Sequence, residues 1–331
     1  MIDNERLDEL KSKMVGKNIV VIGDLMLDAY YWGAVSRISP EAPVPVVEID
    51  NEFFRFGGAA NVANNIIHLG ANPIPIGIIG SDQHGEIFKE LMQKEGITSE
   101  AIFEVSDRPT TTKVRVIADN QHIVRIDKEV KTDITLETED RIMNYLKRNV
   151  ESIDGIILQD YNKGVLTKSL IAKVSEFAKE NVILITVDPK FKNFFEYKNV
   201  TLFKPNRSET EQAYGIKIEN EDDLKKAGQR LLSDLNADNV LLTLSEDGIA
   251  LFERGKPEYK KVPTKARKVA DVSGAGDTVI STLTLALAAG GDLSESAYLA
   301  NFAGGIVCEE VGIVPIETEK LFSSVRKEIN D

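Results

Sequence analysis

Short, nearly uncharged runs recur along this chain, and they constrain its fold more than any other feature. They lie at 18–23, 74–79, 155–159, 182–187 and 240–244. Segments with a helical pattern, such as 86–94 and 137–149, alternate with them. A strand buried on both faces reads as a continuous apolar run, and a parallel strand needs a long crossover to reach its neighbour. The alternation predicts an α/β fold with a doubly wound, mostly parallel central sheet flanked by helices.

Other stretches do not fit this rhythm. Alternating segments at 46–49, 110–118 and 121–127 indicate short strands with one wet face. The pair Asp119-Asn120 between the last two is a hairpin turn signal. These pieces predict a small inserted β-sheet lid, which would be built from about residues 29–55 and 108–128.

Composition excludes several classes of protein. The 331 residues include 40 Lys+Arg and 53 Asp+Glu, so the formal net charge is −13. This balance disfavours binding to nucleic acid or to anionic membranes, although a local basic pocket for an anionic substrate is compatible with it. The single cysteine, Cys308, leaves no intrachain disulfide and favours a reducing compartment. Residues 1–17 lack a signal-peptide pattern, and no uncharged run is long enough to span a membrane, so we expect a cytoplasmic protein.

Polar side chains follow several of the apolar runs. Asp24 comes directly after the first run, Asp160 and Lys163 follow the third, and Lys190 follows the fourth. The carboxyl ends of parallel strands meet at one edge of a sheet, where α/β proteins bind ligands, so these side chains are expected to face one pocket. Asp24 would bind substrate hydroxyls there. A turn-forming role for Asp24 and a plain loop role for the others remain alternatives.

The stretch Asp271–Thr278 precedes a helical pattern that runs without charge or proline from 279 to 289. Gly274 and Gly276 place a permissive loop at the helix start, where unpaired N–H groups and the helix dipole favour an anion. Asp277 then either caps the first turn or accepts a proton from a hydroxyl held beside a bound phosphate. The stretch alone does not decide between these two roles.

A glycine pair, Gly57-Gly58, opens another helix of small residues, with Asn61 one turn along. The amide of Asn61 can both donate and accept hydrogen bonds, which suits sugar hydroxyls. We find no Walker-type phosphate loop, dinucleotide glycine fingerprint, Cys/His metal cluster or Gly-x-Ser-x-Gly elbow.

Several motifs, in this order and separation, resemble those of the ribokinase-like (PfkB) carbohydrate kinases. Gly57–Asn61 and Asp271–Thr278 resemble the two signatures of that family, and Lys204–Glu209 and Thr243–Gly248 resemble its nucleotide-side motifs. Within the family, residues 32–46, 111–118 and 121–127 look like the heptose 7-phosphate kinase branch of bacterial lipopolysaccharide-core synthesis. In many bacteria that kinase is fused to a nucleotidyltransferase. The resemblance here implies a single ribokinase-like kinase domain over residues 1–331, without a nucleotidyltransferase domain.

The resemblance implies ATP-dependent transfer of the γ-phosphoryl group to the anomeric hydroxyl of D-glycero-β-D-manno-heptose 7-phosphate, giving the 1,7-bisphosphate. Asp277 would be the base, and the anion hole would be formed by the amides of Gly274, Ala275 and Gly276. The sugar would be bound by Asp24, Gly57, Gly58 and Asn61. Mg²⁺ and the ATP phosphates would lie near Asn206 and Glu209, and the rest of the nucleotide would contact Thr243, Ser245, Gly248 and Asn301. Ser245 stands where the family has a glycine.

The resemblance also implies cations for the phosphate that the substrate already carries. The candidates are Arg37, Arg125, Lys163 and Lys190, although a salt-bridged lid explains any one of them nearly as well. K⁺ near Asp271 and Ser273 and a homodimer through exposed lid edges are further expectations. A ribokinase-like kinase for another sugar or nucleoside remains an alternative, as does a binding regulator without catalysis, against which the intact Asp277 argues.

Overall fold

The structure, a computed structural model, describes residues 2–119, 121–264, 271–310 and 312–330. Within these residues the main sheet has nine strands in the order β13-β12-β11-β10-β9-β8-β1-β4-β5. All pairs from β5 to β11 are parallel, and β12 and β13 extend one edge in antiparallel fashion. The strands are β1 Asn18–Gly23, β4 Asn72–Gly80, β5 Ile102–Val105, β8 Gly155–Gln159, β9 Leu184–Asp188, β10 Leu202–Phe203, β11 Asn239–Thr243, β12 Ile249–Glu253 and β13 Lys260–Val262.

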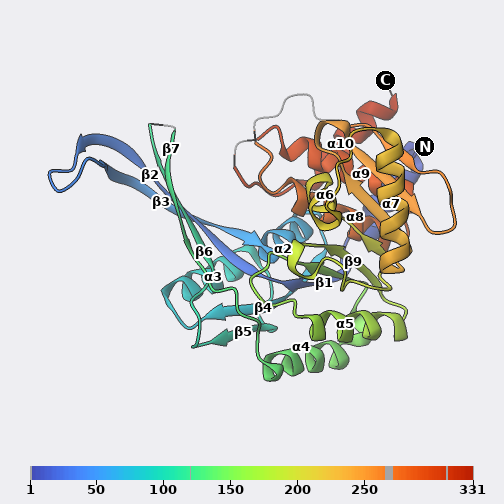
Figure 1. Ribbon diagram of the computed structural model, residues 1–331, viewed down its shortest axis with the longest axis horizontal. Coiled ribbons are helices and arrows are strands. Elements are labelled where there is room, and N and C mark those ends of the chain that lie inside the picture. The colour runs from blue at the N-terminus through green and yellow to red at the C-terminus, as the bar shows by residue number, and fades with distance from the viewer. Residues whose placement is uncertain (1, 120, 265–270, 311, 331) are drawn as a thin grey trace.

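Helices cover both faces of this sheet (Figure 1), which confirms the predicted α/β fold. Strand β1 shows why the apolar runs are continuous. Ile19 and Val21 belong to the core on one face, whereas Val20 and Ile22 belong to the core on the other, and all are fully buried. The helices are α1 Asn4–Met14, α2 Ala59–His68, α3 Gln83–Glu95, α4 Leu136–Arg148, α5 Lys168–Glu180, α6 Arg207–Tyr214, α7 Glu221–Leu235, α8 Ala275–Ala288, α9 Leu293–Val307 and α10 Thr318–Asn330.

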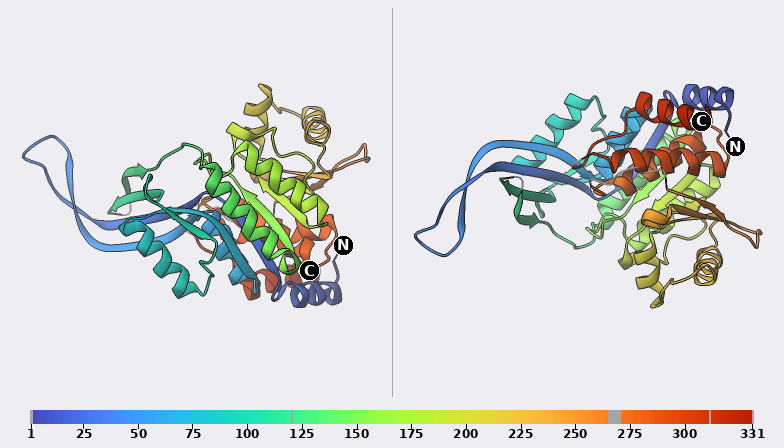
Figure 2. Two further views of the ribbon diagram at one scale, coloured as in Figure 1. Left: turned by 90° about the horizontal axis from the view of Figure 1, so that it is seen from below. Right: turned by 90° about the horizontal axis from the view of Figure 1, so that it is seen from above.

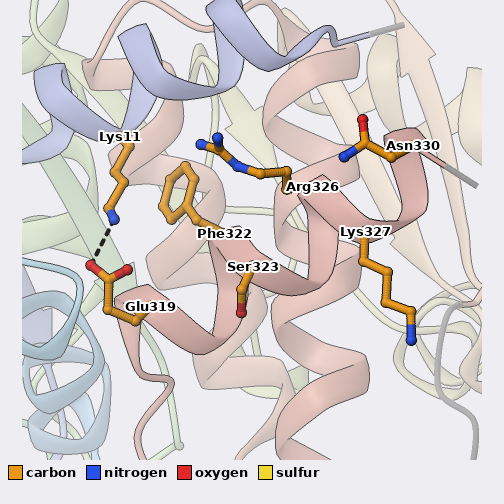
Figure 3. Close-up of a pocket in the computed structure, with 7 residues that line it drawn as sticks. All are labelled: Lys11, Glu319, Phe322, Ser323, Arg326, Lys327 and Asn330. Atoms are coloured by element: carbon orange, nitrogen blue, oxygen red, sulfur yellow. Dashed lines mark hydrogen bonds and ion pairs between the residues drawn. The ribbon is translucent and has the colours of Figure 1, made fainter.

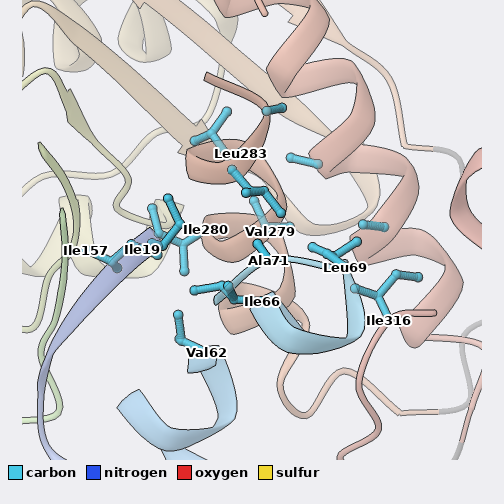
Figure 4. Close-up of a cluster of buried hydrophobic side chains, with 14 of the residues drawn as sticks. Ile19, Val62, Ile66, Leu69, Ala71, Ile157, Val279, Ile280, Leu283 and Ile316 are labelled. Atoms are coloured by element: carbon cyan, nitrogen blue, oxygen red, sulfur yellow. The ribbon is translucent and has the colours of Figure 1, made fainter. Parts of the chain in front are cut away.

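Helices α2 and α8, which carry the two signature motifs, pack against each other and against the sheet. Figure 4 shows Ile66 of α2 close to Val279 and Ile280 of α8, with Ile19 of β1 next to Ile280. Each such side chain contributes roughly 1.5–3 kcal/mol by leaving water. This shared core brings the first turns of the two helices together, although more than two hundred residues separate them in the sequence.

A second, four-stranded sheet has the order β3-β2-β6-β7 and forms the predicted appendage. Its strands are β2 Leu25–Ile38, β3 Pro45–Gly58, β6 Thr112–Ala118 and β7 Gln121–Lys128. Figures 1 and 2 show β2 and β3 reaching away from the main body as a long arm. We call this sheet the lid. The β6–β7 hairpin forms as expected, although Asn120 of the turn signal lies outside the described residues.

The lid is rooted at the edge of the main sheet where the central strands end. Only Asp24 separates β1 from β2, and β3 runs directly into α2. The lid strands therefore begin earlier and end later than the sequence predicts, because β2 and β3 continue down to the strand ends of the main sheet. No described helix has the length and apolar character needed to cross a membrane.

Candidate active site

Asp277 lies on the first turn of α8 and is only 4% exposed. Its carboxylate accepts hydrogen bonds from three side chains: Asn61 Nδ2 to Oδ2 at 2.8 Å, Gln159 Nε2 to Oδ1 at 3.0 Å, and the Tyr161 hydroxyl to Oδ1 at 2.8 Å. Asn61 belongs to α2, whereas Gln159 ends β8 and Tyr161 follows shortly after it. The N-cap of α8 is Gly274, so Asp277 is not the capping residue.

The surroundings of Asp277 tune its proton affinity. Burial raises the pKa of this carboxyl to about 6; nearby Asp188 adds to the rise, while the hydrogen bonds from Asn61 and Tyr161 and the Lys204 ammonium limit it. Such a carboxyl is ionised at neutral pH, yet it binds a proton more readily than an exposed aspartate. This is the balance that a general base requires.

The loop before α8 brings the backbone close to these side chains. Gly274 adopts a left-handed conformation with φ of +80°, and a Cβ there would lie 3.2 Å from Asn61 Nδ2. A Cβ at Gly276 would lie 3.7 Å from Lys204 Nζ. Of the amides expected in the anion hole, that of Ala275 donates to Val272 O at 3.3 Å in this structure. The start of α8 therefore faces a compact polar cluster.

Lys204 is a buried cation in this cluster that the sequence reasoning did not assign. It is 3% exposed, and its Nζ lies 3.0 Å from Asp188 Oδ2. An ammonium beside a helix N-terminus strengthens an anion site. The available signal was its position directly after β10, the same strand-end rule that selected Lys190.

Asp24 is held differently from the expectation. It is 1% exposed, and its carboxylate accepts the backbone N–H groups of Tyr161 at 2.8 Å, Lys163 at 3.0 Å and Val165 at 3.1 Å. Burial raises the pKa of Asp24, and these hydrogen bonds oppose the rise. The carboxylate anchors the loop after β8, as the turn-forming alternative describes, and a contact with sugar hydroxyls stays a prediction.

Asp160 has a similar supporting position. Its Oδ2 accepts the Tyr197 hydroxyl at 2.6 Å, and its Oδ1 accepts the Asn162 N–H at 2.7 Å. Burial raises the pKa of Asp160 to about 6, and the neighbouring Asp24 adds to the rise. These two hydrogen bonds let Asp160 stabilise the loop, while each of its oxygens keeps a second acceptor position.

Asp28 is a buried lid acid to which the sequence reasoning gave no role. It is 2% exposed on β2 and forms an ion pair with Arg115 of β6. A Cβ at Gly57 would lie 2.4 Å from Asp28 Oδ2, so only a glycine in the first signature lets this carboxylate pack against the backbone. Burial raises the pKa of Asp28, and Arg115 opposes the rise. An acid inside an apolar strand was the signal that pointed to it.

The predicted phosphate-binding cations fall into different environments. Arg37 is exposed on the outer part of β2. Arg125 on β7 contacts both oxygens of Asp127, at 2.9 and 3.1 Å. Lys163 Nζ lies 2.6 Å from Glu129 Oε2, and both side chains are 13% exposed. Lys163 and Arg125 therefore lie on the lid side of the site, each with an acidic partner.

Lys113 adds a cation to this side that the sequence reasoning missed. It lies opposite Asp28 on β2 and Asp127 on β7, so these side chains share one face of the lid. Lys113 is half-buried, and it makes no hydrogen bond or ion pair within the described part of the chain. Burial and the like charge of Lys163 lower the pKa of Lys113. We call Lys113, Arg115, Arg125 and Lys163 the lid cations.

Lys190, predicted with Arg37, Arg125 and Lys163 to bind the substrate phosphate, lies beside the nucleotide-side residue Glu209 in this structure. It forms an ion pair with Glu209, and its Nζ is 5.5 Å from the centre of the Tyr161 ring. Burial opposes its charge, but Asp188 and Glu209 outweigh this and raise the pKa of Lys190. Asn206 and Glu209 form a reciprocal capping box at the start of α6, with N···O distances of 2.7 and 2.9 Å.

The remaining nucleotide-side residues meet near the end of β11. Thr243 pairs with Asn206 in a parallel bridge, and Asn301 Nδ2 donates to Pro263 O at 2.7 Å. Gly248 has φ of +84°, and a Cβ there would lie 2.1 Å from Val262 O. Ser245 has φ of +55°, so it keeps the left-handed conformation that its glycine counterpart favours, at a cost of roughly 1 kcal/mol.

Asp271 and Ser273, the expected K⁺ residues, form a tight turn. Asp271 Oδ1 accepts the Ser273 N–H at 2.9 Å, and Oδ2 accepts the Gly312 N–H at 3.1 Å. Burial opposes ionisation, but these hydrogen bonds outweigh it and lower the pKa of Asp271. Across the residues that the structure describes, no group of three or more His, Cys, Asp or Glu side chains is placed to hold a metal ion.

Two surface hollows lie elsewhere. One, of about 350 Å³, runs between α1 and α10, where Lys11, Phe322 and Arg326 line it (Figure 3). The other, of about 450 Å³, lies along α3. Neither includes a residue of the polar cluster around Asp277, so the site is recognised by its chemistry and its position at the strand ends.

Comparison with known proteins agrees with this geometry. The sequence pattern described as pfkB family carbohydrate kinase matches residues 16–319. The chain belongs to this family. Among its pfkB relatives, "Bifunctional protein HldE" of Geobacter sulfurreducens is 41% identical over 324 residues, which are 98% of this chain and 66% of that protein. The protein of the same name from Helicobacter pylori is 42% identical over 305 residues, 92% of this chain and 65% of that protein. The chain thus spans about two thirds of the length of these relatives.

Solved structures show the same pfkB fold at lower identity. Arabidopsis thaliana ribokinase complexed with ribose and ATP has a TM-score of 0.74 and 20% identity, covering 95% of this chain and 99% of that one. Escherichia coli phosphofructokinase-2 in complex with potassium has a TM-score of 0.77 and 20% identity, covering 96% and 100%. The chain is therefore an ATP-dependent carbohydrate kinase by family, and its fold is ribokinase-like.

Proposed function

We propose that this kinase transfers the γ-phosphoryl group of ATP to the anomeric hydroxyl of D-glycero-β-D-manno-heptose 7-phosphate. The observation that carries the proposal is the buried Asp277 carboxylate at the start of α8, held by Asn61 from the other signature. The heptose branch is supported by the lid motifs of the sequence and by 39–42% identity to proteins named HldE.

The reaction needs one proton acceptor and one anion site. Asp277 takes the proton of the anomeric hydroxyl, whose oxygen forms a bond to the γ-phosphorus while the bond from that phosphorus to the bridging oxygen of ADP breaks. The products are ADP and the sugar bisphosphate. The start of α8 and the buried Lys204 ammonium stabilise the negative charge of the phosphoryl group in flight.

Asn61 and Asp28 are the groups best placed to orient the sugar. Asn61 Oδ1 is a buried acceptor with no hydrogen-bond partner among the described residues, and it lies on the same amide that holds Asp277. Asp28 offers a carboxylate packed directly against the backbone of Gly57. Gly57 and Gly58 allow the sugar to approach the backbone closely. We assign Asp24 and Asp160 to supporting the loop after β8.

The lid cations supply the recognition of the 7-phosphate in this proposal. Lys113 forms no ion pair in the described structure, although Asp28 and Asp127 lie opposite it on the neighbouring strands. Burial and the positive charge of Lys163 lower the pKa of Lys113. A phosphate would neutralise both lysines and relieve their mutual repulsion. Arg125 belongs to the same face of the lid, whereas Arg37 is exposed farther along β2.

ATP would lie on the opposite side of Asp277, along Asn206, Glu209, Thr243, Ser245, Gly248 and Asn301. Asn206 and Glu209 carry side-chain oxygens, which Mg²⁺ takes as ligands when phosphates supply the others. Mg²⁺ would neutralise phosphate charge during transfer. We also propose K⁺ binding at the turn formed by Asp271 and Ser273, and a cytoplasmic location, where ATP is available.

The outer lid supports a homodimer as part of the proposal. Strand β7 is an edge strand that is exposed along its length, and apolar side chains of the lid are exposed too: Ile38, Val44, Ile49, Ile123, Val124 and Ile126. Exposed strand edges and apolar side chains favour pairing with a second copy. Such pairing would also hold the lid over the sugar and exclude water.

The test measures ADP release with a panel that contains heptose 7-phosphate, fructose phosphates, ribose and adenosine. The proposal expects the highest kcat/KM with the heptose phosphate. Strong turnover of an unphosphorylated sugar, with none of the heptose phosphate, would favour a ribokinase-like kinase of other specificity. Binding of ATP and sugar with no ADP release from any acceptor would favour a regulator.

A further inference from the structure

We propose that Tyr161 is a positioning residue that determines which oxygen of Asp277 takes the substrate proton and sets the pH range in which it does so. The inference rests on the proposed function only in that Asp277 is the base. It holds for whichever sugar is phosphorylated.

The two oxygens of Asp277 are occupied unequally. Oδ1 accepts both the Tyr161 hydroxyl at 2.8 Å and Gln159 Nε2 at 3.0 Å, whereas Oδ2 accepts only Asn61 Nδ2 at 2.8 Å. A carboxylate oxygen offers about two acceptor positions. Oδ1 is therefore filled, and Oδ2 keeps one position for the substrate hydroxyl. The acceptor oxygen of Asn61, which has no partner in the described part of the chain, belongs to the same side chain that contacts Oδ2.

Tyr161 is itself held at both ends. Its backbone N–H donates to Asp24 Oδ2 at 2.8 Å, while its hydroxyl reaches Asp277. The Lys190 ammonium lies over the ring at 5.5 Å. Asp24 in turn separates β1 from β2, so one tyrosine connects the root of the lid to the base. With both ends fixed, the phenol can hold Asp277 in one orientation.

Other charged groups face Asp277 without a direct hydrogen bond to it. Asp188 at the end of β9 is paired with Lys204, which follows β10, and Lys190 is paired with Glu209 of α6. From β8 and α2 the facing groups, Gln159 and Asn61, are neutral amides. Tyr161 is therefore the only titratable side chain among the described residues that donates a hydrogen bond to this carboxylate.

The phenol can act as a donor throughout the working pH range. Burial raises the pKa of Tyr161 well above that of a free tyrosine, and the Asp277 charge raises it further. A hydrogen bond to the ionised carboxylate stabilises that form, so Tyr161 lowers the pKa of Asp277 from the level that burial alone would give. Removing the hydroxyl should move the titration of Asp277 upward.

The test is the pH profile of Tyr161→Phe, which removes the hydroxyl and keeps the ring. Hydrogen bonds to charged groups correspond to shifts of roughly one pH unit. We expect the acidic limb of kcat/KM to move upward by about that amount, with KM for ATP unchanged. Tyr197→Phe is the matched control, because its buried hydroxyl bonds to Asp160 instead. Its acidic limb should coincide with that of the wild type.

A direct titration keeps the test decisive if Tyr161→Phe turns over too slowly to measure. Carboxyl-carbon NMR of aspartate-labelled protein, with the Asp277 signal identified by its loss in Asp277→Asn, gives the midpoint without substrate. An upward shift in Tyr161→Phe alone supports the inference. A limb and midpoint equal to those of the wild type would overturn it, as would an equal shift in Tyr197→Phe. Full activity of Asp277→Asn would instead overturn the proposed base.

Discussion

The Asn61 amide lies 2.8 Å from Asp277 Oδ2 and so joins α2 to α8 where both helices begin. Asn61→Ala removes this donor and the neighbouring acceptor for the sugar. Because hydrogen bonds to charged groups contribute about 1.5–3 kcal/mol, we expect kcat/KM for the sugar to fall roughly 10–100-fold. KM for ATP should not change. Steady-state kinetics with each substrate varied would check this, and an unchanged sugar kcat/KM would contradict it.

The wild-type enzyme should lose activity as the pH falls through about 6. The pKa of Asp277 is raised to about 6, and only the ionised carboxylate accepts the substrate proton. The log of kcat/KM against pH should therefore have an acidic limb of slope one with its midpoint near pH 6. A flat profile down to pH 5 would contradict the assignment.

The raised pKa of Asp277 also makes the free energy of unfolding depend on pH. This dependence is opposite to that of a salt-bridged aspartate, whose contribution is lost at low pH. The folded protein binds this proton more tightly than the unfolded chain does, so the contribution is present at pH 4 and lost as the pH rises through about 6. Relative to Asp277→Asn, the wild type should lose about 2 kcal/mol of unfolding free energy between pH 4 and pH 7. Urea unfolding of both proteins at each pH measures the difference.

Lys204→Met should reduce kcat roughly 100-fold, because it removes a buried cation beside the anion site. It also leaves Asp188 buried without its partner, which destabilises the fold. The double variant Lys204→Met/Asp188→Asn separates the two effects, since it removes both charges. We expect the double variant to recover thermal stability but not kcat. Recovery of both would assign Lys204 a purely structural role.

Lys113→Met should discriminate between a sugar phosphate and its parent sugar. Loss of one charge-assisted contact predicts a fall of roughly 10–100-fold in kcat/KM for heptose 7-phosphate, with little change for unphosphorylated heptose. Lys128→Met is the matched control, because Lys128 lies on the lid but pairs with Asp82 at 3.3 Å. Equal losses for both sugars would place Lys113 outside the phosphate contact.

Periodicity and strand-end position predicted much of this molecule. Continuous apolar runs such as 18–23 became parallel strands because both faces are covered, and the uncharged run after Asp277 became the buried helix α8. Which strand-end side chains stay free could not be read from the sequence. Asp24 accepts backbone donors from the loop after β8, and Asp160 accepts the phenol of the distant Tyr197, so both contacts depend on the tertiary structure.

The residues that the sequence reasoning overlooked share one property. Each is a charged side chain that is wholly or partly covered by a segment far away in the sequence. Asp28 packs against Gly57 and pairs with Arg115. Lys204 lies close to Gly276 in the first turn of α8 and pairs with Asp188. Lys113 lies beside Lys163 only because the lid meets the loop after β8. Neither propensity nor spacing encodes such long-range pairs, so these neighbours could be identified only from the structure.

The most direct test of the account follows the product of ATP and heptose 7-phosphate by phosphorus NMR, with wild-type protein and with Asp277→Asn. We expect equal amounts of ADP and of a new anomeric phosphate from the wild type. Asp277→Asn should still bind both substrates by calorimetry, with turnover reduced roughly 10²–10⁴-fold. Wild-type activity of this variant, or no anomeric phosphate from the wild type while an unphosphorylated sugar is turned over, would contradict the account.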